Sequence, residues 1–412
     1  MAFEPARALA DLRALADLTG GRDTGGARRV CWTDEWVKAR AYVQDQLAAT
    51  GAQIDRDEAG NVWAYLRGSG DGMVIVGSHV DSVPNGGWLD GVLGIAGALE
   101  VLRATAEAGT PPCTVAFVDF ADEEGARFAR SLFGSSAVSG HLVPAELADL
   151  RDRDGQRLED VLREYDVEIS EVLKAGNRLD GARAYLELHI EQGPVLESEG
   201  LAVGTVLGTV GVERFRAHFS GQAAHAGSTP IRQRRDTFLA AARTALELRE
   251  IALRHDGVCT VGGATSTPGV VTAVPGRTEM LVDQRHLDAG TLAAMKADFV
   301  AAAERFAAEE GCTVEIEQIW RIEPIPFDLG LIDIARAAVR EVTGTDRGLP
   351  SGPLHDAAEV ARTGVPTVMV FSSSTNGISH AKEEDTPIEH LELAIRAYAQ
   401  TVGHAIDLVA AG

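Results

Sequence analysis

Short apolar runs that end in a histidine or an acid constrain the fold of this chain most strongly. Residues 73–76 are apolar and lead into His79, with Asp81 two residues later and Asp90 nine beyond that. The apolar run 114–120 likewise leads directly into Glu123 and Glu124. Continuous apolar runs of this length are typical of buried strands in α/β proteins. Acids at the ends of buried strands are costly unless cations lie nearby, so this pattern suggests a metal site.

The middle of the chain has a different order of predicted helices and strands, which indicates a second domain. At 412 residues the chain is longer than one hydrophobic core usually grows. The predicted elements are a strand at 214–219, a helix at 235–254, strands at 259–262 and 278–284, a helix at 291–309 and a strand at 313–320. This β-α-β-β-α-β order is the split βαβ, or ferredoxin-like, pattern of a small α+β domain.

The segments before and after this middle region both contain continuous apolar runs typical of buried strands, so we expect them to form one discontinuous domain. We therefore predict one α/β domain from residues 1–211 and 329–412, built around a central sheet. Residues 212–328 form the smaller inserted domain. In the larger domain, helices are expected at 6–18, from 34 onward and at 92–102, and a buried strand at 366–371.

The charge balance excludes some classes of partner. The chain has 61 Asp and Glu against 38 Lys and Arg, a formal net charge of -23, which repels nucleic acid and anionic membranes. No basic patch followed by an apolar core marks a signal peptide, and no segment approaches a membrane span, so we expect a cytoplasmic protein. The four cysteines lie far apart and suggest neither a thiolate metal cluster nor a disulfide framework.

Imidazole and carboxylate groups recur at the expected ends of buried strands. Taken singly, each has an ordinary structural explanation, but together they resemble a metal-ligand set. A mixture of His, Asp and Glu without thiolates suits Zn²⁺, Mn²⁺ or Co²⁺ better than Ca²⁺ or an iron–sulfur cluster. Their spacing alone leaves open whether one or two ions bind. The candidates are His79, Asp81, Asp90, Glu123, Glu124, His189, His355, Asp356 and His380.

Five separated blocks of sequence resemble the amidase branch of the M20 metallopeptidases. That branch contains N-carbamoyl-L-amino-acid hydrolases, β-ureidopropionases and allantoate amidohydrolases. The similarity runs in order over nearly the whole chain. The blocks are Gly77-Ser78-His79-Val80-Asp81-Ser82-Val83-Pro84-Asn85-Gly86-Gly87 with Asp90-Gly91, Glu123-Glu124-Gly125, Glu187-Leu188-His189-Ile190-Glu191-Gln192-Gly193-Pro194, Gly221-Gln222-Ala223-Ala224-His225-Ala226-Gly227, and Gly377-Ile378-Ser379-His380.

The resemblance implies two divalent metal ions in each subunit, with Zn²⁺ expected first and Mn²⁺ or Co²⁺ as alternatives. It implies that His79 and His189 each bind one or other metal and that Asp90 bridges the two. Glu124 and His380 then complete the second site. His189 stands where peptidase relatives generally have a carboxylate, which favours amide or ureide hydrolysis over peptide cleavage.

The same resemblance assigns catalytic roles outside the ligand set. Glu123 is expected to be the general base, and Asp81 is expected to accept a hydrogen bond from the far nitrogen of His79. His225 is expected to be supplied by the partner subunit of a homodimer and to polarise the substrate carbonyl. Residues 1–211 and 329–412 are accordingly expected to form the metal-binding catalytic domain, with a central mixed sheet flanked by helices. The inserted domain is expected to serve as a lid and dimerisation domain.

Substrate contacts are expected from Arg285, which suits a substrate carboxylate, and from Gln192, which suits a carbamoyl or ureido group. Two departures from the family pattern fall in the expected pocket. Thr272 stands where the family usually has Asn, so a contact to the substrate carboxylate is either lost or rebuilt through the Thr272 hydroxyl. Pro353 and Leu354 stand where it usually has Ala-Gly. The roles of His355 and Asp356 are left open.

The sequence therefore predicts a metal-dependent amidohydrolase that acts on a small anionic N-carbamoyl, ureido or related N-acyl amino acid. A metal-activated water bridging two ions is the expected nucleophile. Two alternatives remain: a dipeptidase or N-acyl amino acid deacylase on the same scaffold, and a catalytically silent protein that only binds a small molecule.

Overall fold

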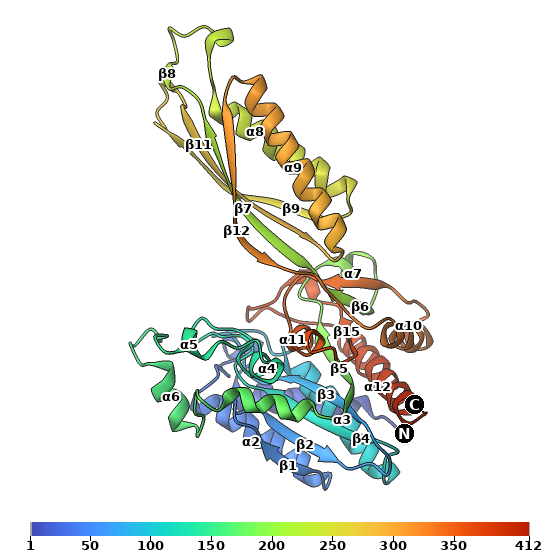
Figure 1. The fold of residues 1–412 in the computed structure, drawn as a ribbon. Helices are drawn as coiled ribbons and strands as arrows, with labels where there is room; N and C mark the ends of the chain where they lie inside the picture. Colours follow the sequence, from blue (N-terminus) through green and yellow to red (C-terminus); the bar gives the residue numbers. More distant parts are fainter. Residues whose placement is uncertain (1, 412) are drawn as a thin grey trace. The chain divides into compact units, whose positions relative to one another are not determined.

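The computed structural model describes residues 2–411 and divides into two units. One contains the chain up to Gly208 and again from Phe327 onward, and the other spans Thr209–Pro326. The first unit is built on a nine-stranded mixed sheet and the second on a four-stranded antiparallel sheet (Figure 1). The α/β fold with a separate small sheet is thus confirmed. The unit boundaries lie within a few residues of the divisions expected at 211/212 and 328/329.

Parallel strands occupy the centre of the large sheet. Strands β4, β3, β5 and β15 lie side by side and run parallel, so their carboxyl ends meet at one edge. Antiparallel strands flank them on both sides. The full order is β1 (Gln53–Arg56), β2 (Val62–Leu66), β4 (Thr114–Phe120), β3 (Met73–His79), β5 (Ala182–Ile190), β15 (Thr367–Ser372), β6 (Val203–Thr209) and β13 (Ile325–Pro326), with β14 (Gly348–Ser351) also pairing with β6.

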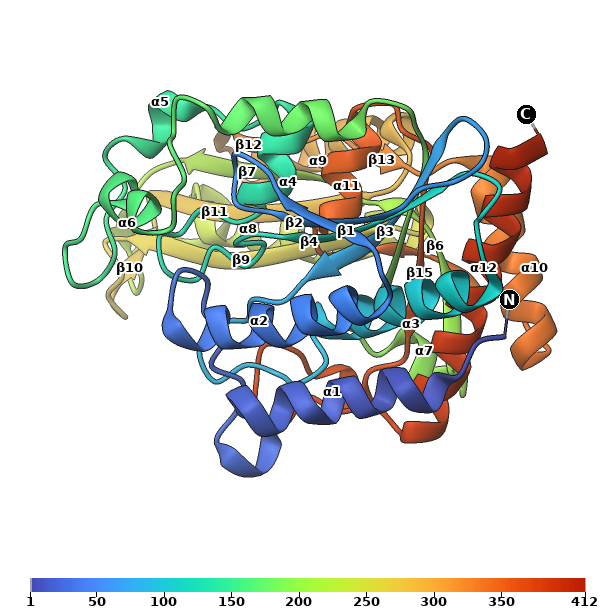
Figure 2. The ribbon, with the colours of Figure 1, turned by 90° about the horizontal axis from the view of Figure 1, so that it is seen from below.

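Helices cover both faces of this sheet (Figure 2). Helix α3 packs on β3 and β5, and α11 packs against β5 and β15 on the opposite face. The helices of the unit are α1 (Pro5–Thr19), α2 (Asp34–Ala49), α3 (Val92–Ala108), α4 (Phe133–Ser139), α5 (Pro144–Leu147), α6 (Leu158–Glu164), α7 (Val195–Ser198), α10 (Leu329–Thr343), α11 (Asp356–Arg362) and α12 (Ile388–Ala411).

Local sequence signals explain where these elements begin and how deeply they are buried. Thr33 caps α2, because its hydroxyl accepts a hydrogen bond from the backbone N–H of Trp36. Every residue of α3 from Val92 to Leu102 is buried, as expected for a helix that is apolar all round. Every residue of β3 is also buried, because helices cover the sheet on both faces.

The second unit has the predicted β-α-β-β-α-β order. Its sheet order is β12-β7-β11-β9, and helices α8 and α9 lie along one face (Figure 1). Phe215, Met280 and Phe299 form part of the core between the sheet and the helices. The elements are β7 (Gly211–Ser220), α8 (Thr237–Arg254), β9 (Val258–Thr267), β11 (Arg277–His286), α9 (Ala289–Glu309) and β12 (Thr313–Ile322), with a separate pair β8 (Ala224–His225) and β10 (Ala273–Val274).

Among residues 2–411, no helix is both long enough and apolar enough to cross a membrane. Within the same residues the four cysteines are free thiols. Cys31, Cys113 and Cys312 are buried, whereas Cys259 is half-buried.

Shortening a buried leucine of α3 tests the packing of the large unit. Leu99 is 0% exposed, so Leu99→Ala leaves a cavity and is expected to lower the free energy of unfolding by about 2–5 kcal/mol. Leu408→Ala on α12 is the matched control, because Leu408 is 52% exposed, and should change it by less than about 0.5 kcal/mol. Denaturant unfolding of both variants measures the difference, and equal losses would contradict the packing described.

Candidate metal centre

The carboxyl edge of the parallel strands gathers the histidines and acids that the sequence singled out. His79 is the last residue of β3, Glu123 and Glu124 follow β4, and His189 lies one residue before the end of β5. Asp90 lies just before α3, and His380 lies in the irregular segment between β15 and α12. Potential ligand atoms of His79, Asp90 and His189 lie within 4.8 Å of one another, as do those of Asp90, Glu124 and His380.

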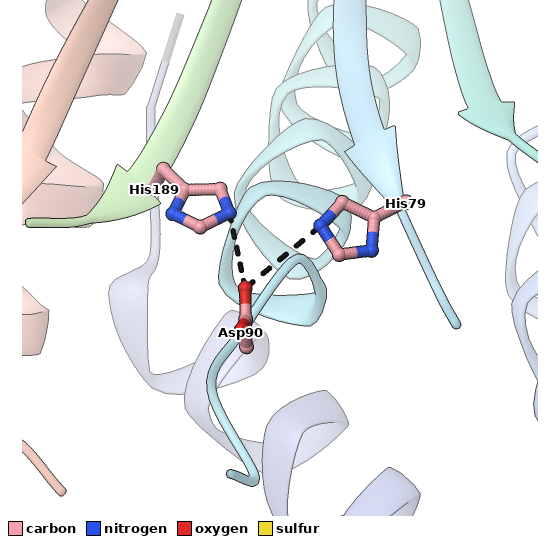
Figure 3. Close-up of side chains that lie close together, drawn as sticks. All are labelled: His79, Asp90 and His189. Atoms are coloured by element: carbon pink, nitrogen blue, oxygen red, sulfur yellow. Dashed lines mark ion pairs between the residues drawn. The ribbon is translucent and has the colours of Figure 1, made fainter. Parts of the chain in front are cut away.

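Asp90 belongs to both groups and faces each with a different oxygen. Its Oδ1 lies 3.3 Å from His189 Nε2 and 3.9 Å from His79 Nε2 (Figure 3). Its Oδ2 lies 3.3 Å from His380 Nε2, which is 3.4 Å from Glu124 Oε2. One carboxylate therefore stands between two sets of donor atoms, as a bridging ligand would.

The donor atoms at this edge fit a divalent cation. His189 Nε2 is buried and makes no hydrogen bond to any of residues 2–411, although it faces Asp90. His189 Nδ1 lies 2.9 Å from the carbonyl oxygen of Ile190, which accepts a hydrogen bond from Nδ1–H. In the neutral imidazole this leaves the Nε2 lone pair directed at Asp90. A lone pair and a carboxylate at this separation repel each other unless a proton or a metal cation lies between them. Imidazole with carboxylate is the donor chemistry of Zn²⁺ and related ions.

Burial and like charge dominate the electrostatics of the acids. Burial raises the pKa of Glu123 well above its usual range, and burial together with Asp90 raises the pKa of Glu124 to about 8. Burial opposes ionisation of Asp90 too, but the imidazoles of His189 and His380 outweigh it and hold the pKa of Asp90 well below its usual range. Neighbouring cations would favour the charged form of all three carboxyl groups.

Asp81 connects two parts of the site. Its carboxylate accepts hydrogen bonds from the backbone N–H groups of Glu123, at 3.2 Å, and Glu124, at 3.1 Å. The oxygen of Asp81 nearest to His79 Nδ1 is the backbone carbonyl, at 3.1 Å, whereas the carboxylate lies 3.6 Å away. Asp81 thus holds the Glu123–Glu124 segment with its side chain and contacts the imidazole of His79 mainly through its backbone.

A pocket of about 200 Å³ opens beside the two ligand groups. Gln192 lines it, but the Gln192 side-chain amide donates to Asp90 Oδ2, at 3.1 Å, and to Ser379 Oγ, at 3.0 Å. Gln192 therefore contacts a candidate ligand directly, in addition to facing the space expected for substrate. The lining residues are Asp90, Glu123, Glu124, Ser131, Leu132, His189, Gln192, Pro353, Leu354, His355 and His380.

A third group, formed by Glu187, His189 and His355, also brings potential ligand atoms within 4.8 Å. Both oxygens of Glu187 are already engaged. They accept hydrogen bonds from Ser78 Oγ at 2.8 Å, Tyr185 Oη at 3.0 Å and the backbone N–H of Ala357 at 3.0 Å. Glu187 therefore anchors the start of α11 to the sheet. The ring of His355 packs 4.2 Å from that of His189, between centroids.

The predicted substrate residues of the second unit lie at two ends of its sheet. His225, on β8, is exposed, and its Nδ1 accepts hydrogen bonds from the backbone N–H groups of Gly227 and Ser228, at 3.1 and 3.2 Å. A neutral imidazole in this setting carries its proton on Nε2, which is then a donor. Thr272 lies beside it, because the Thr272 carbonyl accepts from Ala226 N.

Arg285 lies at the other end of the small sheet, next to the last residue of β11, where it donates to Asp283 at 2.8 Å. The start of β11 pairs with the end of β7, close to β8 (Figure 1). Arg285 lies eight positions after Arg277, which corresponds to about 26 Å at about 3.3 Å per residue. The structure thus places Arg285 far from His225 and Thr272 within one chain.

Glu384 is not among the residues predicted from the sequence, yet it is 0% exposed and contacts the backbone of Asp90. Its Oε1 accepts from the backbone N–H groups of Leu89 and Asp90, both at 3.1 Å, and its Oε2 accepts from Ser379 Oγ at 2.8 Å. Burial, then Asp90, raises the pKa of Glu384 to about 7. In the sequence, Glu384 stands in the polar run 382–385, which resembles a solvated loop, so no local signal marks it.

Comparisons with known proteins agree with this geometry. Residues 75–404 match the model of peptidase family M20/M25/M40. The chain is 32% identical over 386 residues to an allantoate amidohydrolase of Bacillus subtilis, covering 92% of each chain. It is 33% identical over 387 residues to an N-carbamoyl-L-amino acid amidohydrolase of Geobacillus stearothermophilus, covering 93% of this chain and 94% of the relative.

A crystal structure of an amidase of the hydantoinase/carbamoylase family from Burkholderia multivorans has the same fold. Its TM-score is 0.84 at 32% identity, covering 100% of this chain and 98% of that one. The resemblance drawn from the five sequence blocks is therefore confirmed. The chain belongs to peptidase family M20/M25/M40 and, within it, to the hydantoinase/carbamoylase amidase branch, which includes allantoate amidohydrolases and N-carbamoyl-L-amino acid amidohydrolases.

Proposed function

We propose that this protein is a dimeric, two-metal amidohydrolase that hydrolyses the ureide C–N bond of a small N-carbamoyl or ureido acid. The observation that carries the proposal is the position of Asp90, whose two oxygens face two separate sets of donor atoms. His79 and His189 would hold one divalent cation with Asp90, and Glu124 and His380 would hold the second. Zn²⁺ is the expected ion, with Mn²⁺ and Co²⁺ as alternatives.

When bound, two such cations lower the pKa of a water molecule and stabilise negative charge on the carbonyl oxygen. Glu123 lines the pocket with its Oε2 3.8 Å from His79 Nε2. It accepts the proton of the attacking water and returns it to the leaving nitrogen as the C–N bond breaks. For an N-carbamoyl amino acid the products are the free amino acid and carbamic acid, which decomposes to carbon dioxide and ammonia.

Two features of the second unit support a homodimer in which His225 acts on the partner's substrate. A substrate much shorter than about 26 Å is unable to contact Arg285 at one end of β11 and His225 beyond the other end in the same chain. If Arg285 binds the substrate carboxylate and His225 polarises its carbonyl, the two must therefore come from different subunits. The Nε2 proton of His225 supplies the donor that this role requires.

A candidate surface for that dimer lies on the same unit. Leu239, Leu246 and Leu253 of α8 are 45%, 73% and 68% exposed and recur every seven residues, so they form a stripe on one face of the helix. Within the described residues, β9 pairs only with β11 and leaves its other edge open. An apolar stripe and an open strand edge on one unit suit a second copy of this chain.

Replacing Glu123 separates chemistry from metal binding. Glu123→Gln is expected to lower kcat on an N-carbamoyl amino acid by about 10²–10⁴-fold, because the amide is unable to accept the proton of the attacking water. Metal content, measured by elemental analysis, should remain that of the wild type. Glu146→Gln, at an exposed position, is the control and should leave both quantities unchanged. Wild-type turnover by Glu123→Gln would reject Glu123 as the base.

Mixing two inactive variants tests whether His225 acts across subunits. Glu123→Gln and His225→Ala homodimers should each have little activity. After subunit exchange, each mixed dimer has one site with both groups intact, so random mixing should restore about a quarter of wild-type activity. If His225 served its own subunit, the mixture would remain inactive. Analytical ultracentrifugation confirms that exchange has produced dimers.

The apolar wall of the pocket favours one class of ureido acid. Leu132, Pro353 and Leu354 line it, and proline lacks an N–H group. A second ureido group facing this wall would lose hydrogen bonds to water without replacing them, whereas an apolar side chain would gain by burial. We therefore propose an N-carbamoyl amino acid with an apolar side chain as the substrate, with allantoate as the poorer candidate.

Selectivity for the side chain tests this assignment. Wild-type kcat/KM should be higher for N-carbamoyl-leucine than for N-carbamoylglycine, by about 4-fold for each methylene buried. Leu354→Ala should lower that ratio by about 10-fold and leave the rate on N-carbamoylglycine nearly unchanged. Leu408→Ala, at an exposed leucine, is the control. Preference for allantoate would exclude this substrate class, and amine release from dipeptides without ammonia would favour a peptidase.

A further inference from the structure

The two segments that carry Asp90 and His380 have little regular structure of their own to fix them. Asp90 lies in the loop between β3 and α3, and His380 lies between β15 and α12. His380 has a left-handed backbone, with φ 56°, and its side chain is 53% exposed. The second ligand group, Asp90 with Glu124 and His380, is therefore the more open of the two metal-ligand groups.

Glu384 joins these two segments through one buried carboxylate. On one side it accepts the backbone N–H groups of Leu89 and Asp90, and on the other it accepts Ser379 Oγ. Ser379 in turn accepts from Gln192 Nε2 at 3.0 Å, and Gln192 Nε2 also donates to Asp90 Oδ2. Glu384 thus fixes the backbone of Asp90 and the residue before His380 at the same time.

The approach of Glu384 depends on a glycine of the Asp90 loop. A Cβ added at Gly87 would lie 1.8 Å from Glu384 Oε1 and 1.9 Å from its Cδ, far inside van der Waals contact. Any larger residue at this position must therefore displace the Glu384 carboxylate or the loop itself. Gly87 provides an independent way to disturb the same contact without changing Glu384.

We propose that Glu384 is a positioning residue that fixes the positions of Asp90 and His380 relative to each other. It thereby sets the affinity of the second metal site. This inference rests on the proposed two-metal function. Hydrogen bonds that orient ligands typically change metal affinity by about 10–100-fold when they are removed. The first group, with His79 and His189 on regular strands, depends less on Glu384 because β3 and β5 already fix its histidines.

Metal binding to the full-length protein, stripped by a chelator and dialysed against graded Zn²⁺, tests the proposal directly. The wild type should bind two ions per chain. Glu384→Ala should keep one tight ion and bind the other about 10–100-fold more weakly. Glu384→Gln should bind both nearly normally, because its amide oxygen still accepts from the backbone N–H groups and its NH₂ group donates to Ser379. Gly87→Ala should resemble Glu384→Ala.

Asp57 offers a matched control for general destabilisation. It is a buried carboxylate that accepts from the backbone N–H groups of Ala59 and Asn61, both at 3.0 Å, and from the indole N–H of Trp63 at 2.8 Å, none of which is a candidate ligand. Asp57→Ala should lower the melting temperature and still bind two ions. The inference is overturned if Glu384→Ala and Gly87→Ala bind both ions with wild-type affinity, or if Asp57→Ala also loses the second ion. A wild type that binds fewer than two ions overturns the two-metal function itself.

Discussion

The carboxylate of Asp90 is the constraint on which the rest of the site depends. Its oxygens are placed 3.3 Å from His189 Nε2 on one side and 3.3 Å from His380 Nε2 on the other. Both oxygens reach these positions only if the backbone of Asp90 is fixed relative to β5 and to the segment before α12. The hydrogen bonds from Leu89 and Asp90 to Glu384, and from Gln192 to Asp90, supply that fixation.

Close packing around Asp90 explains two glycines of the sequence block that begins at Gly77. Gly91 has φ 69°, a conformation that glycine adopts readily, and a Cβ there would lie 2.4 Å from Cε1 of His79. Gly87 leaves room for the carboxylate of Glu384. The loop between β3 and α3 thus approaches a candidate ligand from one side and a positioning acid from the other, and both contacts require the absence of a side chain.

The sequence predicted the strands and most candidate ligands for the same physical reason. Parallel strands buried on both faces read as continuous apolar runs, so a polar residue at their ends, such as His79 or Glu123, is conspicuous. Residues that act through tertiary contacts give no such signal. Glu384 lies in a charged segment, and its burial depends on Ser379 and the Asp90 loop folding around it. The direct contact of Gln192 with Asp90 also required the structure, since sequence spacing indicated only a position near His189.

Charge balance shows why this edge of the sheet is suited to cations. Asp81, Asp90, Glu123 and Glu384 are all buried, and the guanidinium of Arg29, which is 0% exposed, interacts electrostatically with Asp81, Asp90 and Glu384. Burial lowers the pKa of Arg29 to about 10 despite the acids around it, so Arg29 is charged at neutral pH. The Nε of Arg29 donates to the carbonyl of Val80, and Arg29 is not among the residues that line the pocket. Its positive charge therefore does not face the pocket. The buried acids that line the pocket therefore require further positive charge within it. A divalent cation held by the imidazole and carboxylate groups would supply that charge.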